Sequence, residues 1–519
     1  MIYLSSRYPD SQASEVCLKN RNHISTDKRM DFFTVIGSFG WWQLRVFLFF
    51  TCLNVVAVWQ NFSIIFLAPN MDFSCVQPSS PYQSNGSDDR CWVPQDPNSS
   101  VLAPCTRWEY NTSKTSHTIV SEWDLVCERE WLVSLTKSVY MIGFLFSGIV
   151  FGQTSDSIGR YPTLLICYVV TCISMFLSLL SGSFTMFIIL RFLQAFGRAG
   201  ATTVGFVLIM ELVGPKHQTE VGIFIQLGWT VGYVTLVGIA WFFRHWFWLQ
   251  LIISLSFLPF ALFFTLIPES PRWLLTRGKT EKLEKLLMKA ATINKRDVTE
   301  DIKELIKSAN LSEKEVKETA SVLEVLKMPK MRNRTFKMIY LWFVNAFLYY
   351  VFSYNTNDLA GDPYLNFFIS GFIEFPSYAF VFWGIKKWGR RPILILCMAV
   401  GGVACSAIPL VPSDIAWLST TFAMVGKFCV TGSFGILCLY TTEVFPTSMR
   451  NATYGSCSMF ARIGSILAPF VRDLGKATHP TVPNVLYAFL ALSSSLLTLL
   501  LPETKGLDLP DTLQEAAEM

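Results

Sequence analysis

The chain contains twelve runs of about 20 apolar residues, and this repetition limits its fold more than any other feature. A helix of about 20 apolar residues crosses the hydrocarbon core of a bilayer, so each run has the length of one span. Of the 519 residues, 51% are hydrophobic and only 16% are charged, which suits lipid as the surrounding solvent. The runs lie at about 44–67, 131–151, 163–182, 185–212, 219–242 and 246–267, and again at about 336–356, 364–385, 393–411, 415–441, 453–474 and 484–501.

The two sets of six runs share a short polar joint. Gly159-Arg160-Tyr161-Pro162 separates the second and third runs, and Gly389-Arg390-Arg391-Pro392 separates the eighth and ninth. Glu211 is echoed by Glu443 at nearly the same separation along the chain. Duplicated halves that enclose a site near the midplane are typical of secondary transporters of the major facilitator type. The sequence therefore predicts an all-α membrane protein with twelve transmembrane helices in two six-helix, pseudo-repeated halves, the major facilitator fold.

A polar loop at 68–130 indicates the orientation of the chain. It holds four cysteines and three glycosylation sequons, and both disulfides and N-glycans form on the lumenal or extracellular side. The loop is therefore expected outside, which places both joints inside. The four cysteines allow three pairings, and their spacing does not choose among them. The disulfide candidates are Cys75, Cys91, Cys105 and Cys127, and the glycosylation candidates are Asn85, Asn98 and Asn111.

The expected organisation has five parts. A tail at 1–40 precedes an N-terminal half at 41–267, and a linker at 268–335 leads to a C-terminal half at 336–502 and a tail at 503–519. Basic residues before the first run favour a cytoplasmic N-terminus, and an even number of spans returns the C-terminus to the same side. In the linker, Leu283, Leu287 and Ala290 have helical spacing among lysines. That pattern predicts either basic amphipathic helices on the inner membrane face or a solvated helical linker.

Several blocks beyond the joints resemble one family. They are Pro268-Glu-Ser-Pro-Arg-Trp-Leu-Leu275, Thr442-Glu-Val-Phe-Pro-Thr447 with Arg450, and Leu501-Pro-Glu-Thr-Lys-Gly506. Together with the Cys-bearing first loop they are similar to the organic cation, anion and carnitine transporters, solute carrier family 22 of the major facilitator superfamily. The resemblance implies carriage of small organic ions across the plasma membrane by alternating access, with both termini cytoplasmic.

Charged residues at the inner ends of the spans are the candidate gate. Opposite charges there can pair across the interface between the halves when the inner side is closed, and separate when it opens. The simpler interpretation is that they only cap helices and mark the interface. The gating candidates are Asp156, Arg160, Glu211, Arg390 and Glu443. Lys386 stands near the position in the second joint where an acidic residue is expected. The ion pairing that closes the inner side is therefore predicted to be weaker at the second joint than at the first.

Two opposite charges lie inside the spans of the second half. Arg462 stands well within the eleventh run, where a charge costs about 2.5–3.5 kcal/mol on insertion scales and so usually faces a cavity or a partner. Glu374 is the charge of the eighth run, and we expect the two to present both signs to the substrate. Alternatively, Arg462 pairs with a carboxylate and only holds the bundle together. Tyr378 stands where the family's anion carriers often have Lys, which favours a carnitine-type pocket.

Aromatic and amide residues complete the predicted pocket. Cation–π contact with an ammonium group is the physical reason to include them, although a membrane aromatic residue more often packs or faces lipid. By resemblance to family positions, the further substrate-binding candidates are Asn61, Gln226, Trp229, Tyr349 and Phe434.

No sequence motif supports catalysis. There is no Walker A loop, no His-Glu-x-x-His and no Gly-x-Ser-x-Gly, so we expect neither an enzyme, nor a cofactor, nor a metal site, and no nucleic-acid partner. The expected partners are a small organic ion, the lipid bilayer and a co- or counter-ion. The expected cargo ranges over organic cations, zwitterions such as carnitine, and anions. The alternatives are a dedicated organic anion exchanger and a transporter-like receptor without flux.

Overall fold

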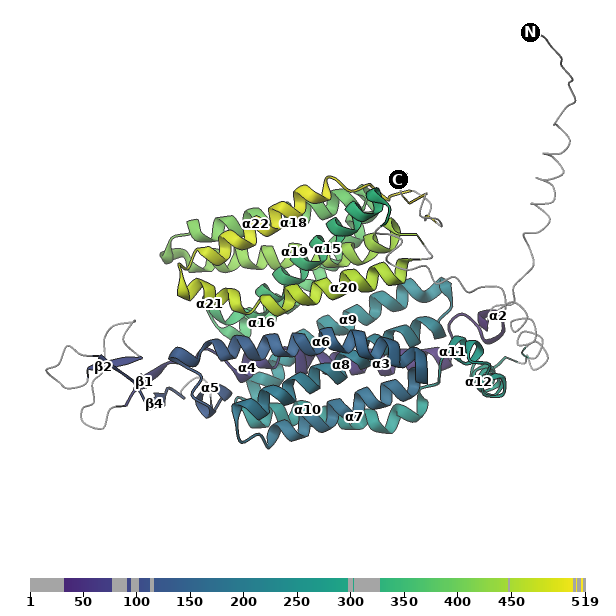
Figure 1. The fold of residues 1–519 in the computed structure, drawn as a ribbon, viewed down its shortest axis with the longest axis horizontal. Coiled ribbons are helices and arrows are strands. Elements are labelled where there is room, and N and C mark those ends of the chain that lie inside the picture. Colours follow the sequence, from purple (N-terminus) through teal and green to yellow (C-terminus); the bar gives the residue numbers. More distant parts are fainter. Residues whose placement is uncertain are drawn as a thin grey trace, which may run out of the picture.

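Twelve membrane helices, several of them broken, make up two halves that lie side by side (Figure 1). The computed structural model describes residues 32–76, 91–94, 102–112, 116–296, 302, 327–446, 449–506, 510 and 515–516. After a short helix α2 (Phe32–Ile36), the N-terminal half consists of α3 (Trp41–Phe62) continued by α4 (Ile64–Leu67), α6 (Trp131–Ile158), α7 (Arg160–Leu179), α8 (Phe184–Leu212), α9 (Pro215–Phe242) and α10 (Trp246–Phe263). The C-terminal half consists of α15 (Pro329–Tyr354), α16 (Pro363–Phe372) with α17 (Glu374–Trp388), α18 (Arg390–Ala407), α19 (Ala416–Val444), α20 (Arg450–Leu467) with α21 (Phe470–Ala477), and α22 (Val482–Thr498).

Within the described residues, ten of these membrane helices are long and apolar enough to span a bilayer, judged by length and composition alone. The other two positions are held by α20, which contains Arg462, and by the shorter α22. Two spans break beside a proline, because proline removes a backbone donor and crowds the preceding turn. One of these two breaks positions Glu374. Pro376 lies just after the break between α16 and α17, so Glu374 falls in the first turn of α17. The predicted six-plus-six arrangement is confirmed, although α15 begins at Pro329, earlier than the expected 336.

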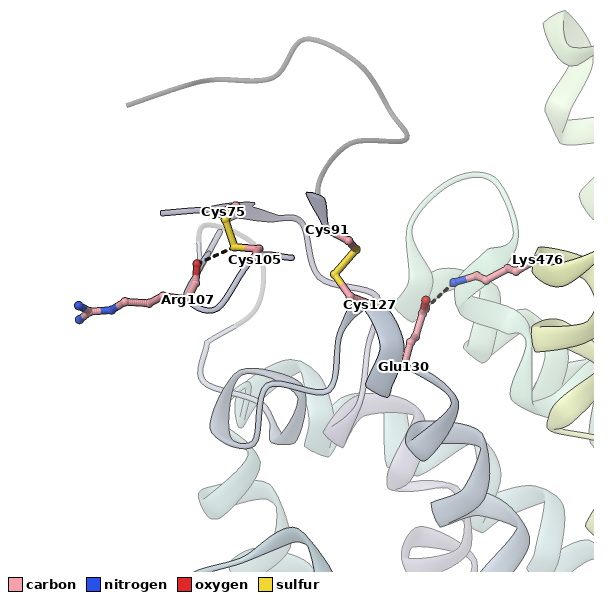
Figure 2. Close-up of a disulfide and its surroundings, with 7 residues drawn as sticks. All are labelled: Cys75, Cys91, Cys105, Arg107, Cys127, Glu130 and Lys476. Carbon is pink, nitrogen blue, oxygen red and sulfur yellow. Dashed lines mark hydrogen bonds and ion pairs between the residues drawn. A yellow bond between two sulfur atoms is a disulfide. The ribbon is translucent and has the colours of Figure 1, made fainter. Parts of the chain in front are cut away.

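The polar loop stands at one end of the bundle, opposite the joints, in Figure 1. It contains two small antiparallel pairs, β1 (Phe73–Cys75) with β4 (Trp108–Tyr110) and β2 (Trp92–Pro94) with β3 (Leu102–Pro104). The disulfides join Cys75 to Cys105 and Cys91 to Cys127, which decides between the three pairings (Figure 2). Two short segments, α5 (Ile119–Glu122) and the 3-10 turn Cys127–Arg129, lead into α6. We call this the loop end and the opposite side the joint end.

The loop is docked onto the start of α10. Trp246 donates its amide to the His117 carbonyl at 3.0 Å, and the rings of His117 and His245 stack at 5.7 Å. Burial, with the neighbouring His117, lowers the pKa of His245, which favours the neutral ring that accepts a bond from the Phe247 amide. Among the glycosylation candidates, Asn111 is exposed after β4, whereas Asn85 and Asn98 lie outside the described residues. Glycosylation stays a prediction.

Part of the linker folds against the N-terminal half at the joint end. Helices α11 (Pro271–Thr276) and α12 (Thr280–Ile293) pack together and against α2, α3 and α8. Leu283, Leu287 and Ala290 are each fully buried. The apolar stripe of α12 is therefore covered by protein, which argues against a fully solvated linker for this part.

Candidate functional site

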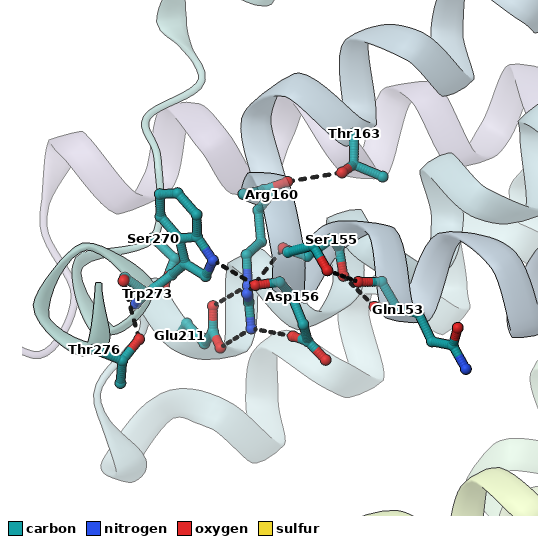
Figure 3. A network of polar contacts seen from close by, with 12 residues as sticks. Gln153, Ser155, Asp156, Arg160, Thr163, Glu211, Ser270, Trp273 and Thr276 are labelled. Carbon is teal, nitrogen blue, oxygen red and sulfur yellow. Dashed lines mark hydrogen bonds and ion pairs between the residues drawn. The ribbon is translucent and has the colours of Figure 1, made fainter.

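The first joint holds its arginine between two carboxylates of the same half. Gly159, with φ of +113°, ends α6 and begins α7, so that the Arg160 side chain turns back toward α8. Its Nε and Nη2 atoms donate to both carboxylate oxygens of Glu211 at 3.1 Å, and Nη2 also lies 3.1 Å from Asp156 (Figure 3). Arg160 and Glu211 are largely buried, whereas Asp156 is 73% exposed. The bidentate pair with Glu211 is therefore the stronger contact.

The second joint repeats this geometry. Gly389 has φ of +102°, and Arg390 donates to the Glu443 carboxylate at 3.1 Å from Nε and 2.7 Å from Nη2. In the described part of the chain, no second carboxylate pairs with this guanidinium, and Lys386 instead lies 4.1 Å from the centre of the Phe382 ring. In this structure these charges do not pair between the halves, because each arginine binds the glutamate of its own half, and gating stays a prediction. The local reason is reach, since both partners lie on helices packed within one half.

Each joint also contains a glutamate that the sequence reasoning missed. The Glu269 carboxylate accepts the backbone amide of Arg160 at 2.8 Å, and the Glu503 carboxylate accepts that of Arg390 at 3.0 Å. Each carboxylate thereby accepts backbone N–H groups that have no partner within their own helix. They lie at a helix N-terminus, where negative charge is favoured. The available signal was the repeated triplet Pro-Glu-Ser/Thr after the last span of each half.

At mid-depth, Glu374 is fully buried and accepts three contacts. Its Oε1 lies 2.8 Å from the Tyr349 hydroxyl and 3.1 Å from the Lys427 ammonium, and its Oε2 accepts Thr230 at 3.1 Å. The ion pair of Glu374 is with Lys427 and not with Arg462, and the expectation that Glu374 and Arg462 both face the substrate stays a prediction. Lys427, on α19 and 1% exposed, is close enough to neutralise the carboxylate.

Other pocket candidates extend this network across the interface. Trp229 of α9 donates its indole N–H to the Tyr349 hydroxyl at 2.8 Å, which links the N-terminal half to α15. The Phe434 ring lies 6.2 Å from the Tyr349 ring. Tyr378, one turn after Glu374, faces the Gly435 backbone of α19. The structure thus brings Trp229, Tyr349, Glu374 and Phe434 together, and their contact with substrate stays a prediction.

The remaining candidates lie apart from the carboxylate. Arg462 is half-buried, and its guanidinium carbon lies 5.1 Å from the centre of the Phe144 ring of α6. Asn61 is fully buried in α3, and Gln226 is exposed one turn before Trp229. No contact with Glu374 is recorded for these three among the described residues.

The sequence reasoning also missed three buried cations of the N-terminal half. Lys137 on α6, and Arg191 and Arg198 on α8, are at most 6% exposed. Arg191 donates to the Gln60 carbonyl at 3.2 Å and lies over the Tyr140 ring, and Lys137 lies 5.4 Å from the Tyr354 ring centre. Arg198 lies over Phe144 and Trp229. The rule that singled out Arg462, a charge inside an apolar run, would have found all three.

The two halves are tied together at the loop end. Arg472 of α21 binds Asp358 at 3.3 Å in its own half, and reaches Glu130 at 3.6 Å and Asn70 at 2.7 Å in the other. Lys476 also contacts Glu130, which closely follows the disulfide-bonded Cys127 (Figure 2). Among the described residues of the membrane helices, no ion pair joins the halves at the joint end. We call Asn70, Glu130, Asp358, Arg472 and Lys476 the loop-end cluster.

The described residues contain no group of three His, Cys, Asp or Glu side chains placed to hold a metal ion.

Known proteins match this architecture over most of the chain. The model of the family described as "Sugar (and other) transporter" matches residues 84–515. An organic cation transporter protein of Drosophila melanogaster is 34% identical, over 93% of this chain and 94% of that protein. Solute carrier family 22 member 1 of Bos taurus is 32% identical, over 93% and 92%. In fold, the chain is similar to the inward-open xylose transporter XylE of E. coli, with a TM-score of 0.63 at 16% identity, over 92% of this chain and 98% of that one.

The two relatives, at 34% and 32% identity and each matched over more than nine-tenths of both chains, agree with the family model and with the two-half bundle. The predicted fold and family are confirmed, and a catalytic function is excluded by family and fold. The chain is a transporter of small organic ions with the major facilitator fold, and it belongs to solute carrier family 22.

Proposed function

We propose that the chain carries small organic ions across the plasma membrane by alternating access around the Trp229–Tyr349–Glu374 network. The observation that carries this proposal is the pair of hydrogen bonds that crosses the interface at mid-depth. Trp229 and Thr230 of α9 donate to Tyr349 and Glu374 of the other half. A substrate that contacts these groups touches both halves at once, so its binding free energy differs between arrangements of the halves, as alternating access requires.

The loop end is the extracellular side in this proposal. The disulfides and the exposed Asn111 sequon support that orientation, because both modifications belong outside the cytosol. The loop-end cluster then holds the outer side closed. Asp156, Arg160, Glu211, Arg390 and Glu443 act at the inner side by keeping each half rigid as it rocks, rather than by bonding the halves to each other.

Uptake by proteoliposomes tests the function. Carnitine, phenyltrimethylammonium and benzoate, each with and without a Na⁺ gradient, cover zwitterion, cation and anion and report the coupling ion. Saturable uptake of at least one probe is expected. Binding without net movement of any probe would instead identify a receptor.

Weakening the loop-end cluster should open the outer side. Arg472→Ala removes the contacts to Glu130 and Asn70, and partly exposed pairs are each worth up to about 1 kcal/mol. Losing two such contacts should raise the outward-open population several-fold, read as faster labelling of Ser138→Cys by an impermeant thiol reagent. Ser138 is buried where α6 meets α20.

Arg244→Ala is the matched control, since Arg244 lies at the same end but contacts Trp241 of its own half. Equal labelling rates in both variants would contradict a closing role for the cluster.

A further inference from the structure

The joint end of α17 carries exposed basic and aromatic side chains that the transport function does not use. Lys386, Lys387 and Trp388 lie in its last turn, one turn after Phe382 and Trp383. The Lys386 ammonium lies 4.1 Å from the centre of the Phe382 ring. The Lys387 ammonium lies 4.9 Å and 5.3 Å from the ring centres of Trp383 and Trp388. We call these residues the α17 patch.

The first half has no such patch, although the two halves repeat each other. Counted back from the glycine of each joint, Asp156 and Ser157 stand where the second half has Lys386 and Lys387. Asp156 pairs with Arg160 at 3.1 Å, whereas Lys386 lies over an aromatic ring. The first joint is built without these lysines, so the geometry of a joint does not explain their presence in the second.

In the part of the chain that the structure describes, no carboxylate forms an ion pair with a lysine of the α17 patch. The carboxylates of the second joint, Glu443 and Glu503, are bonded by Arg390 and by backbone amides. Lys505 adds a further positive charge, because its ammonium donates to the Lys387 carbonyl at 2.9 Å. An ammonium has three N–H donors, and one that lies over a ring can still donate to an acceptor from outside the protein.

The α17 patch lies at the depth where lipid headgroups begin. Lys386 follows the mid-depth Glu374 by twelve residues, which is about 18 Å along a helix that rises roughly 1.5 Å per residue. Half of the hydrocarbon core of a bilayer is about 15 Å thick. The ammonium groups therefore reach the headgroup layer, whereas Phe382, about 12 Å from Glu374 along the helix, stays within the hydrocarbon. Lysines that extend from the hydrocarbon edge, beside tryptophan rings, are suited to contact lipid headgroups.

We propose that the α17 patch and Lys505 bind an anionic phospholipid of the leaflet at the joint end. The negatively charged headgroup lies among the three ammonium groups, and the acyl chains run along Phe382 and Trp383. A zwitterionic headgroup carries a cation of its own, which these lysines repel, so net negative charge is the property that the site selects. The inference requires only that a bilayer surrounds the bundle, and it goes beyond the proposed transport function without depending on it.

Native mass spectrometry of the purified full chain tests the site. Dioleoylphosphatidylglycerol should bind about tenfold more tightly than dioleoylphosphatidylcholine, which has the same acyl chains. The variant Lys386→Gln/Lys387→Gln should lose most of this preference and bind phosphatidylcholine as the wild type does. The matched control is Lys282→Gln/Lys285→Gln, because these two exposed lysines of α12 lie at the same end and their removal changes the net charge equally. Equal losses of preference in the two variants would overturn the site and show a general attraction of basic surfaces to anionic lipid.

Thermal unfolding in detergent micelles gives an independent measurement on the wild type. Phosphatidylglycerol should raise the melting temperature more than phosphatidylcholine does, and added salt should reduce the difference because the lysines are exposed. Equal stabilisation by the two lipids would contradict selection by charge. Uptake of organic ions is measured separately, so loss of the lipid preference would leave the transport proposal standing.

Discussion

Replacing Lys427 with Met should destabilise the protein by about 3–5 kcal/mol, because it strands the Glu374 carboxylate in the middle of the bundle. Lys427 and Glu374 are 1% and 0% exposed and 3.1 Å apart. Removing one partner of a buried pair leaves an uncompensated charge, whereas removing both leaves none. The double variant Lys427→Met/Glu374→Gln should therefore recover most of the loss. The measurement is the free energy of unfolding in detergent micelles for wild type, both single variants and the double variant.

The single variant Glu374→Gln provides a second check. It leaves the Lys427 ammonium buried without its carboxylate and should also be less stable than the wild type. Additive effects of the two single substitutions would show that the pair is not coupled, and Glu374 would then need another counter-charge.

Gly159→Ala should cost about 2–4 kcal/mol, combining backbone strain with loss of a helix cap. The φ of +113° is one that side chains rarely adopt, and an added Cβ would lie 2.4 Å from a carboxylate oxygen of Glu269. That carboxylate must move, although it accepts the Arg160 amide at the start of α7. The unfolding free energy reports the loss, and the rate of uptake reports whether the joint matters for rocking.

Gly152→Ala, two turns earlier in α6, is the matched control. Nothing lies within 4 Å of the point that a Cβ would occupy there, and the residue stands inside the helix with ordinary helical backbone. Alanine at this position should be neutral or stabilising by up to about 1 kcal/mol. Equal losses of unfolding free energy in Gly159→Ala and Gly152→Ala would contradict this prediction. They would show that the positive φ at the joint adds nothing to the cost of a side chain.

Charged residues make two kinds of contact in this carrier. At the joint end, Arg160 and Arg390 each bind a glutamate of the same half. At mid-depth and at the loop end, hydrogen bonds and ion pairs cross between the halves. The motion that alternating access requires must break the contacts of the second kind and can leave those of the first kind intact.

The relative named as an organic cation transporter protein matches 93% of this chain at 34% identity. Among the described residues of the membrane helices, four cations, Lys137, Arg191, Arg198 and Lys427, are at least nine-tenths buried, and so are the carboxylates of Glu374 and Glu443. Of these groups, Lys427 and Glu374 form an ion pair at 3.1 Å.

Local patterns in the sequence determined the architecture. Apolar runs as long as a bilayer is thick can only be spans, the repeated Gly-Arg joint marks two halves, and cysteines with sequons mark the loop, because each of these depends on neighbours along the chain. The tertiary structure decided what depends on residues far apart in sequence. It chose Lys427 over Arg462 as the partner of Glu374, paired Cys75 with Cys105 and Cys91 with Cys127, and brought Arg198 and Arg462 to one ring. Such partners are set by how helices pack, and a packing arrangement has no signature in the order of the residues.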